Sequence, residues 1–340
     1  MIATGLAAPA ASDRSSEKDT LRRIQASVKE RLDRVTDEMA SSVLSDAPLL
    51  AQMGQHLMAM RGKMFRPTLV LLCSSVENDS RDEVVKLAAA VELIHLATLV
   101  HDDAVDHSVL RRGMPTLNSL FTHQISVIMG DFLYSIALTK LVQLGDIDAL
   151  RALTRASTEM TIGEMRQLAV NDSLSFSEDD YYALIRSKTA SLMSAACEVG
   201  SIAGALQHRE TLIRYGDALG MAFQIADDLI DYTEAQETTG KPTGLDLKEH
   251  KVTLPLIAAL RVMSAAERVR VNALFANESP GDDEVAEVIR IVTANGGLDY
   301  AREKGALFAD EARKALAGLP ETVARQALYE SISYVMERHA

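Results

Sequence analysis

The chain has 340 residues, of which 47% are hydrophobic and 24% charged, and its formal net charge at pH 7 is −13. This acidic balance argues against nucleic acid and anionic membrane surfaces as partners, so an anionic substrate would have to be attracted by metal ions or a local basic pocket. Two cysteines exclude a disulfide framework, and the apolar helical stretches around Cys73 and Cys197 indicate buried thiols in a reducing compartment.

The first elements in chain order are a tail and a series of helices. Residues 1–17 begin with an Ala- and Ser-rich stretch that lacks the basic start of a secretory signal, so we expect a disordered tail and a cytoplasmic protein. No proline lies between Thr116 and Lys241, where apolar residues recur with helical periodicity. No shift in composition marks a linker. The sequence therefore predicts an all-α fold, in which residues 18–340 form a single-domain antiparallel helical bundle around a central cavity.

A basic cluster precedes the first long apolar segment. Lys63 and Arg66 flank a predicted helix start, and a helix N-terminus favours anions. The apolar segment 87–100 is interrupted by Glu92 and His95, so we expect no integral membrane segment. Alone, His95 would more often be a satisfied core histidine. Glu92-x-x-His95 also matches half of a di-iron carboxylate site, but the sequence has no second Glu-x-x-His.

The same acidic pentad occurs twice, each time at the end of a strongly apolar run. Asp102-Asp103-Ala104-Val105-Asp106 is the first copy, and Asp227-Asp228-Leu229-Ile230-Asp231 is the second. The first and last acids of each copy share one helix face, where like charges repel and give the helix no stability. Two such faces that confront each other across a cavity would bind hard divalent cations such as Mg²⁺, which takes further ligands from water and substrate phosphates.

Acidic clusters are often only helix starts, and the chain contains two clusters of that kind. Ser177-Glu178-Asp179-Asp180 and Pro280-Gly281-Asp282-Asp283-Glu284 place acids in a first helical turn, where they complement the helix dipole. Neither cluster has a third Asp, and neither follows an apolar run. For a single pentad, a purely structural role and metal binding are about equally favoured. Two matched copies in matched apolar contexts favour metal binding.

Further basic residues follow each pentad. Arg111 and Arg112 precede Gly-x-Pro just beyond the first pentad, where two guanidinium groups on a turn would clamp a diphosphate. A polar loop with Gly and Pro, residues 233–251, follows the second pentad and is a candidate active-site lid. Most isolated lysines are merely solvated. The isolated lysines that could complete a basic pocket are Lys188, Lys241 and Lys251.

These motifs stand in the order found in the trans-isoprenyl diphosphate synthases, and from about Leu21 to its C-terminus the chain resembles that family. The matching motifs are Gly62-Lys63-x-x-Arg66-Pro67, Glu92-x-x-His95, Leu99-x-His101-Asp102-Asp103-x-x-Asp106, Arg111-Arg112-Gly113-x-Pro115-Thr116, Gly130-Asp131, Lys188-Thr189-Ala190, Phe223-Gln224-Ile225-x-Asp227-Asp228-x-x-Asp231, Gly240-Lys241-x-x-Gly244-x-Asp246 and Lys251-x-Thr253-Leu254-Pro255. His250 departs from the family pattern, in which glycine commonly precedes the lid lysine.

The resemblance implies a helical bundle of the isoprenoid synthase type and a role for each motif. Implied ligands of about three Mg²⁺ ions per active site are Asp102, Asp106 and Asp227, supported by Asp103, Asp228 and Asp231. Implied contacts of the allylic diphosphate are Arg111, Lys188 and Lys241, over which Lys251 closes. Implied contacts of isopentenyl diphosphate, bound without metal, are Lys63, Arg66, His95 and Arg112. Thr189 and Gln224 would line the reacting carbon, where their dipoles stabilise an allylic cation.

The implied reaction is a head-to-tail (1′-4) condensation of isopentenyl diphosphate with an allylic diphosphate primer, repeated to give a trans-polyprenyl diphosphate. The C–O bond of the allylic partner ionises while Mg²⁺ neutralises the departing diphosphate, the double bond of isopentenyl diphosphate attacks, and a proton is lost. By the same resemblance we expect a homodimer, and a product that is a precursor of a quinone side chain.

Product length is expected to depend on the helix that carries the first pentad. Ala97 and Thr98, about one turn before Asp102, are small, and each open turn of about 5.4 Å would admit about one more isoprene unit. Phe132 on a neighbouring helix is the candidate floor of the tail path. The sequence thus predicts products of about C30–C50. The alternative interpretation is that Ala97 is small only for helix packing, and the alternative function is a shorter synthase of about C15–C20.

Four other interpretations fit part of the pattern. A terpene cyclase shares the fold but needs no second diphosphate pocket, and a head-to-head synthase of the squalene type would lack the basic set that binds it. A non-catalytic subunit would lose acids from one or both pentads, whereas both are complete here. A purely structural bundle would leave six buried or nearly buried aspartates unexplained and costly.

Overall fold

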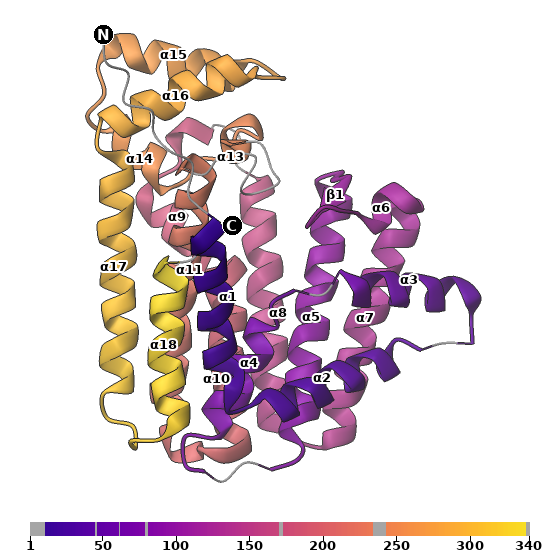
Figure 1. The fold of residues 1–340 in the computed structure, drawn as a ribbon. Coiled ribbons are helices and arrows are strands. Elements are labelled where there is room, and N and C mark those ends of the chain that lie inside the picture. The colour runs from indigo at the N-terminus through magenta and orange to yellow at the C-terminus, as the bar shows by residue number, and fades with distance from the viewer. Residues whose placement is uncertain are drawn as a thin grey trace.

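Helical periodicity along the chain produces an almost entirely helical structure (Figure 1). The computed structural model describes residues 11–44, 46–60, 62–78, 81–169, 173–233 and 243–337. Its elements are α1 (Ala11–Ala26), α2 (Lys29–Ser42), α3 (Pro48–Ala59), α4 (Phe65–Ser74), α5 (Val84–Val105), β1 (Leu110–Arg111), β2 (Met114–Pro115), α6 (Leu117–Leu120), α7 (His123–Leu144), α8 (Ile147–Leu168), α9 (Glu178–Ile185), α10 (Ser191–Gly204), α11 (Arg209–Thr233), α13 (Leu245–Lys248), α14 (Leu254–Leu260), α15 (Ala265–Ala276), α16 (Asp282–Ala294), α17 (Gly297–Leu316) and α18 (Val323–Glu337). The predicted all-α class is confirmed.

The two helices that end in the pentads lie inside the bundle. α5 is apolar almost all round and packs against α4 and α7, which is the pattern of a core helix. α11 contributes to two core clusters: Tyr215 and Leu219 belong to one, and Met221 and Ile225 belong to the other. Because α11 is fixed from both sides, the backbone before the second pentad has little freedom to move.

α5 and α7 are each long and apolar enough to cross a membrane by length and composition alone. Glu92 and His95, the two polar residues of the apolar segment, lie within α5 beside the charges of Arg66 and Arg112. The most apolar window of α5 is 67% buried, as in a core helix, whereas that of α7 is 33% buried. α7 is therefore less enclosed than α5, and its exposed large apolar side chains are Ile128 and Val142.

The two acidic clusters that served as comparisons for the pentads are helix starts, as predicted. Ser177 Oγ accepts a hydrogen bond from the backbone N–H of Asp180, 3.1 Å away, and Asp180 Oδ2 accepts from the backbone N–H of Ser177. At the start of α16, Glu284 Oε2 accepts from the backbone N–H of Gly281 at 2.8 Å. These are capping arrangements, which satisfy backbone donors at the first turn.

The N-terminal region differs from the sequence prediction. α1 begins at Ala11, so residues 11–17 of the expected tail are helical in this structure, while residues 1–10 lie outside the described residues. The helix packs beside α18 (Figure 1). Ile24 is fully buried, and the carboxylate of Glu17 pairs with Lys63. Composition alone suggested a tail because these tertiary contacts come from residues far along the chain.

Gly200 of α10 allows α10 to lie against α4. A Cβ atom at position 200 would lie 2.4 Å from the carbonyl oxygen of Val70 and 2.8 Å from Cβ of Cys73. Because the first neighbour is backbone, we predict that Gly200→Ala lowers the free energy of unfolding by about 1–3 kcal/mol in urea denaturation. Gly318→Ala is the control, since nothing lies within 4 Å of its added Cβ. Equal losses in the two variants would contradict close packing at Gly200.

Candidate functional site

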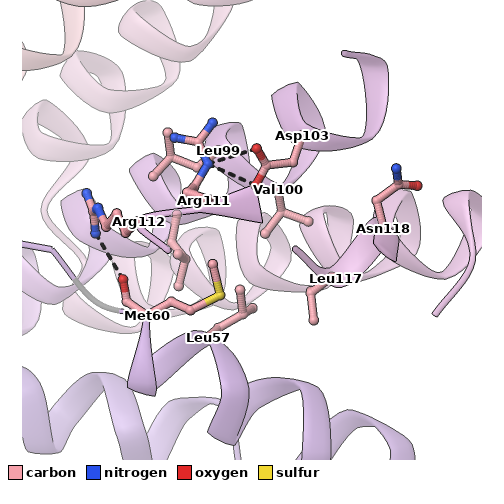
Figure 2. A pocket seen from close by; sticks show the side chains of 10 residues that line it. Leu57, Met60, Leu99, Val100, Asp103, Arg111, Arg112, Leu117 and Asn118 are labelled. Atoms are coloured by element: carbon pink, nitrogen blue, oxygen red, sulfur yellow. Dashed lines mark hydrogen bonds and ion pairs between the residues drawn. The ribbon is translucent and has the colours of Figure 1, made fainter. Parts of the chain in front are cut away.

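The first pentad occupies the C-terminal end of α5, where Asp106 caps the helix. Asp103, the middle acid, is buried, and its two carboxylate oxygens accept hydrogen bonds from Nε of Arg111 at 2.8 and 2.9 Å (Figure 2). A buried carboxylate is stable only when it is paired. Asp103 therefore fixes an arginine of the predicted diphosphate clamp.

That clamp is a β-hairpin formed by β1 and β2, in which Arg111 lies opposite Met114. The two turn residues, Arg112 and Gly113, both have positive φ, 53° and 75°, as a two-residue hairpin of the primed type requires. Arg112 Nη1 donates to the carbonyl oxygen of Met60 at 3.0 Å (Figure 2). A Cβ at Gly62 would lie 2.5 Å from that guanidinium group. The Gly62-Lys63 motif and the hairpin motif therefore meet in space.

A small pocket lies against this hairpin (Figure 2). Its charged side is formed by Asp103, Arg111 and Arg112. Its remaining lining is mostly apolar and comes from α3, α5 and α6: Leu57, Met60, Leu96, Leu99, Val100, Leu117 and Asn118. The hairpin thus rests on an apolar base, which holds its arginines beside the end of α5.

The second pentad lies near the C-terminal end of α11, and its middle acid is also held by protein donors. Tyr181 Oη donates to Asp228 Oδ2 at 2.6 Å, and Gln224 Nε2 donates to Asp228 Oδ1 at 2.8 Å. Thr189 Oγ1 donates to Gln224 Oε1 at 2.8 Å. Thr189 and Gln224, expected to lie together, are therefore joined in one network with Asp228. Tyr181 was missed, because its position in the first turns of α9 resembles ordinary helix packing.

Asp231, the last acid of the second pentad, fixes the start of α13. Its Oδ1 accepts from the backbone N–H of Leu245 at 3.0 Å, and its Oδ2 accepts from that of Asp246 at 3.1 Å. The backbone N–H of Lys251 in turn donates to the carbonyl oxygen of Asp246 at 2.7 Å. His250 has φ 55°, which explains why glycine is common at this position. The described part of the predicted lid is thereby anchored to the pentad.

Lys188 lies in a π-helical turn, Arg186–Ala190, a feature that is frequent at functional sites. Its Nζ is 2.6 Å from Glu164 Oε1 and donates to Gln167 Oε1 at 3.3 Å. Gly163 allows α8 to approach closely, because a Cβ there would lie 3.0 Å from Cβ of Ser187. Glu164 and Gln167 were also missed by sequence reasoning. Their i, i+3 spacing directly after a mid-helix glycine was the available signal.

Electrostatic effects connect the ends of the two pentad helices. Burial raises the pKa of Asp102 to about 6, a shift that Lys188 opposes and that Glu164 and Asp106 increase. Burial works against the charge of Lys251, but Glu249, 2.6 Å away, together with Asp106 and Asp246, raises its pKa. Lys188 therefore lies near Asp102, and Lys251 lies near Asp106. In Figure 1 the hairpin and α13 occupy the same end of the bundle.

A second basic group surrounds the middle of α5. Arg66 Nη1 lies 3.0 Å from His95 Nε2, and arginine can only donate, so this histidine nitrogen is an acceptor and the ring is neutral. Burial, followed by the charges of Arg66, Arg112 and Arg111, holds the pKa of His95 well below its usual range. Glu92 is buried beside Arg66 and Arg112. This arrangement brings together Arg66, His95 and Arg112 as predicted, and Lys63 follows the adjoining Gly62.

The residues expected to control product length lie on α5 and α7. Ala97 is buried, and Thr98 is half-buried with its hydroxyl donating to the carbonyl oxygen of His95 at 2.7 Å. Phe132 is half-buried and packs against the main core cluster. Their roles remain predictions. Lys241, the remaining expected site residue, lies outside the described residues.

The chemistry of the acid groups fits a hard divalent cation. Asp102, Asp106 and Asp227 offer carboxylate oxygens, the ligand type that Mg²⁺ prefers. Within the described residues, no three His, Cys, Asp or Glu side chains converge closely enough to hold an ion on their own. Mg²⁺ usually keeps several water molecules and takes further ligands from substrate phosphates.

Comparison with known proteins gives consistent matches over most of the chain. The model of the polyprenyl synthetase family matches residues 47–292. The all-trans-nonaprenyl-diphosphate synthase (geranyl-diphosphate specific) of Rhodobacter capsulatus is 37% identical over 87% of this chain and 91% of the relative. The octaprenyl diphosphate synthase of Escherichia coli strain K12 is 36% identical over 84% of this chain and 88% of the relative. A crystal structure of a polyprenyl synthase from Caulobacter crescentus CB15, complexed with calcium and isoprenyl diphosphate, has a TM-score of 0.89 at 35% identity and covers 94% of this chain and 98% of that one.

The raised pKa of Asp102 makes cation binding sensitive to pH. A carboxyl group must lose its proton to bind a metal ion, so protons and Mg²⁺ compete for Asp102. With a pKa of about 6, we predict that Mg²⁺ binds about fourfold more weakly at pH 5.5 than at pH 8 in isothermal titration calorimetry. Asp102→Asn is the control and should retain only the pH dependence that comes from other groups, among them Asp228, whose pKa burial raises to about 7. Binding that is equally tight at both pH values would contradict a role for Asp102.

Proposed function

The chain belongs to the polyprenyl synthetase family of prenyltransferases, and we propose that it condenses isopentenyl diphosphate head-to-tail with an allylic diphosphate, repeatedly, to give a long-chain trans-polyprenyl diphosphate. One observation carries the proposal: the basic side chains divide into two groups. Lys188 and Lys251 lie near the acids of the first pentad, whereas Arg66 lies with neutral His95 beside the middle of α5. Two diphosphates need two such groups.

The allylic diphosphate is assigned to the group near the pentads. Asp102, Asp106 and Asp227 would hold Mg²⁺, which when bound supplies Lewis-acid neutralisation of the departing diphosphate. Arg111 is held at its Nε by Asp103, beside the C-terminal end of α5. Lys188 provides a positive charge whose position is fixed by α8. Lys241 is assigned to this diphosphate by the family motif alone, and we infer a complement of about three Mg²⁺ ions on the same basis.

Isopentenyl diphosphate is assigned to Lys63, Arg66, His95 and Arg112, without metal. Arg66 and Arg112 provide fixed guanidinium groups suited to diphosphate oxygens. Neutral His95 orients Arg66 by accepting its hydrogen bond. The buried Glu92 balances part of the positive charge, so the site is not overwhelmingly cationic before its substrate arrives.

The hydrogen-bond network at the second pentad fits a role at the reacting carbon. Gln224 accepts from Thr189 and donates to Asp228, so the orientation of its amide group is fixed in advance. Dipoles fixed before the reaction stabilise a developing cation without reorganisation. Thr189 and Gln224 are therefore proposed to line the allylic carbon, while Tyr181 and Asp228 keep them in place.

Two observations favour long products. The relatives at 36–37% identity are named octaprenyl and nonaprenyl diphosphate synthases. Ala97 leaves no bulky side chain on α5 one turn before the pentad. We propose a product of about C30–C50, since each helical turn of about 5.4 Å accommodates about one isoprene unit. Such a chain suits a quinone side-chain precursor, and a product of about C15–C20 is the alternative function.

We also propose that a second copy of the chain covers α7, in a homodimer in the cytoplasm. Ile128 and Val142 of α7 are 61% and 65% exposed, although the helix is apolar enough to lie in a core. Exposed apolar side chains on such a helix favour an interface between subunits. Sedimentation equilibrium tests the state, and a monomer at micromolar concentration would contradict it.

Turnover tests the proposed function directly. The full chain is incubated with radiolabelled isopentenyl diphosphate, Mg²⁺ and one allylic primer at a time, including geranyl diphosphate, for which the nonaprenyl relative is named as specific. Products are dephosphorylated and sized by chromatography. Products of about C30 or longer support the proposal, products of about C15–C20 favour the alternative, and absence of elongation with every primer contradicts both.

The pentads provide the first prediction for this assay. Asp102→Asn and Asp227→Asn should each lower kcat by at least about 100-fold, because each removes a charge that acts on the leaving diphosphate. Asp179→Asn is the matched control, since Asp179 belongs to the capping cluster of α9. Circular dichroism checks that the variants fold. Near-normal turnover of either pentad variant would contradict the assignment.

Position 97 provides the second prediction. Ala97→Phe should shorten the product to about C15–C20, because the ring would fill the tail path about one turn from Asp102. Phe132→Ala should lengthen the product, because Phe132 is the residue proposed to close the far end of the space for the hydrocarbon tail. The KM for isopentenyl diphosphate serves as the internal control and should change little in either variant. Unchanged product lengths would assign both residues to packing alone.

A further inference from the structure

The N-terminal helix reaches the basic group assigned to isopentenyl diphosphate. Glu17 of α1 places its Oε1 2.5 Å from Nζ of Lys63. Tyr334 of α18 donates from its hydroxyl group to the same oxygen at 3.3 Å, and its ring lies 5.7 Å from the lysine nitrogen. A carboxylate of the protein itself is therefore already paired with the lysine that would bind a diphosphate.

The ion pair between Glu17 and Lys63 belongs to the packing of α1 against the rest of the protein and is not an isolated surface contact. Gln25, two turns further along α1, donates from Nε2 to the carbonyl oxygen of Lys63 at 2.9 Å and lies 3.1 Å from Oγ1 of Thr68. α1 thus holds both the backbone and the side chain of Lys63. The two anchors differ in kind, since Gln25 carries no charge and Glu17 does.

The exposed fractions of the Lys63 and Glu17 side chains show which of the two a ligand would contact first. The Lys63 side chain is 49% exposed, whereas that of Glu17 is 10% exposed. An incoming diphosphate could therefore reach the ammonium group, but it would find that charge already neutralised by a sheltered carboxylate. To use Lys63 fully, the diphosphate must displace the carboxylate and take over its contact.

We propose that Glu17 is a built-in competitor that lowers the affinity of the metal-free site for isopentenyl diphosphate. The inference rests on the proposed function, since it takes Lys63 to be a ligand of that diphosphate. Glu17 holds Lys63 in the empty enzyme and releases it when the substrate binds, so that its side chain sets the substrate concentration at which the site fills.

The test is the affinity for isopentenyl diphosphate alone, measured by titration calorimetry on the full chain without Mg²⁺ or allylic primer, so that no turnover occurs. Glu17→Gln keeps the size of the side chain and removes its charge. Exposed to partly exposed ion pairs make modest contributions, so Glu17→Gln should tighten binding roughly two- to fivefold. In a Lys63→Ala background the same change should have no effect, because the competitor has lost its target.

Two further variants separate charge from helix docking. Asp19→Asn removes an exposed charge on the same helix, paired locally with Arg22, and should leave the affinity unchanged. Gln25→Ala loosens α1 but retains the carboxylate, and should not tighten binding. Unchanged or weaker binding by Glu17→Gln, or an equal gain from Gln25→Ala, would overturn the competitor role. Failure of the wild-type chain to bind isopentenyl diphosphate would instead overturn the proposed function, and this inference with it.

Discussion

The arrangement of the site depends on the burial of one carboxylate in the middle of each pentad. A buried carboxylate must be paired or hydrogen-bonded, and Asp103 and Asp228 meet that demand with groups from other elements. Asp103 thereby fixes the hairpin, while Asp228 fixes Tyr181 and the amide of Gln224. Of the outer acids, Asp102, Asp106 and Asp227 are not fully buried, whereas Asp231 holds the start of α13. Each pentad thus has a buried middle acid that holds neighbouring elements in place. The proposed metal ligands lie beside it on the same helix.

Sequence reasoning found the residues that belong to short motifs and missed those that act across the fold. Helical periodicity is a local pattern, so the fold class could be predicted. The i, i+4 acids and the arginine turn are local patterns too, so candidate site residues could be named from the sequence, and their roles stay predictions. Tyr181, Glu164 and Glu17 each contact the site from a different helix, at sequence separations of 47, 24 and 46 residues from their partners. For Glu164, the local signal was its position directly after a mid-helix glycine, whereas nothing in the local sequence of Tyr181 or Glu17 marks these residues as parts of the site. The hairpin turn was placed correctly, but its positive φ at Arg112 was not foreseen.

Backbone strain is concentrated beside the same groups. Met64, Arg112 and His250 all have positive φ, a conformation that non-glycine residues rarely adopt. Each lies within two residues of a side chain assigned to the substrates, and two of them are held by distant carbonyl oxygens, Met60 for Arg112 and Asn277 for His250. Such residues persist where the surrounding structure over-determines them. The basic side chains assigned to the substrates are therefore attached to backbone whose conformation is fixed by the surrounding structure.

The near-complete burial of α5 has a consequence for how the enzyme handles its own product. A hydrocarbon tail that runs along this helix can only occupy volume that side chains would otherwise fill, since the surrounding helices leave the core closely packed. On the tail path proposed above, the growing tail would act as a removable part of the hydrophobic core, and each added isoprene unit would bind more strongly as it covers more apolar surface. Such an enzyme would retain its longest product most tightly, so departure of the finished chain would be slower than departure of shorter products.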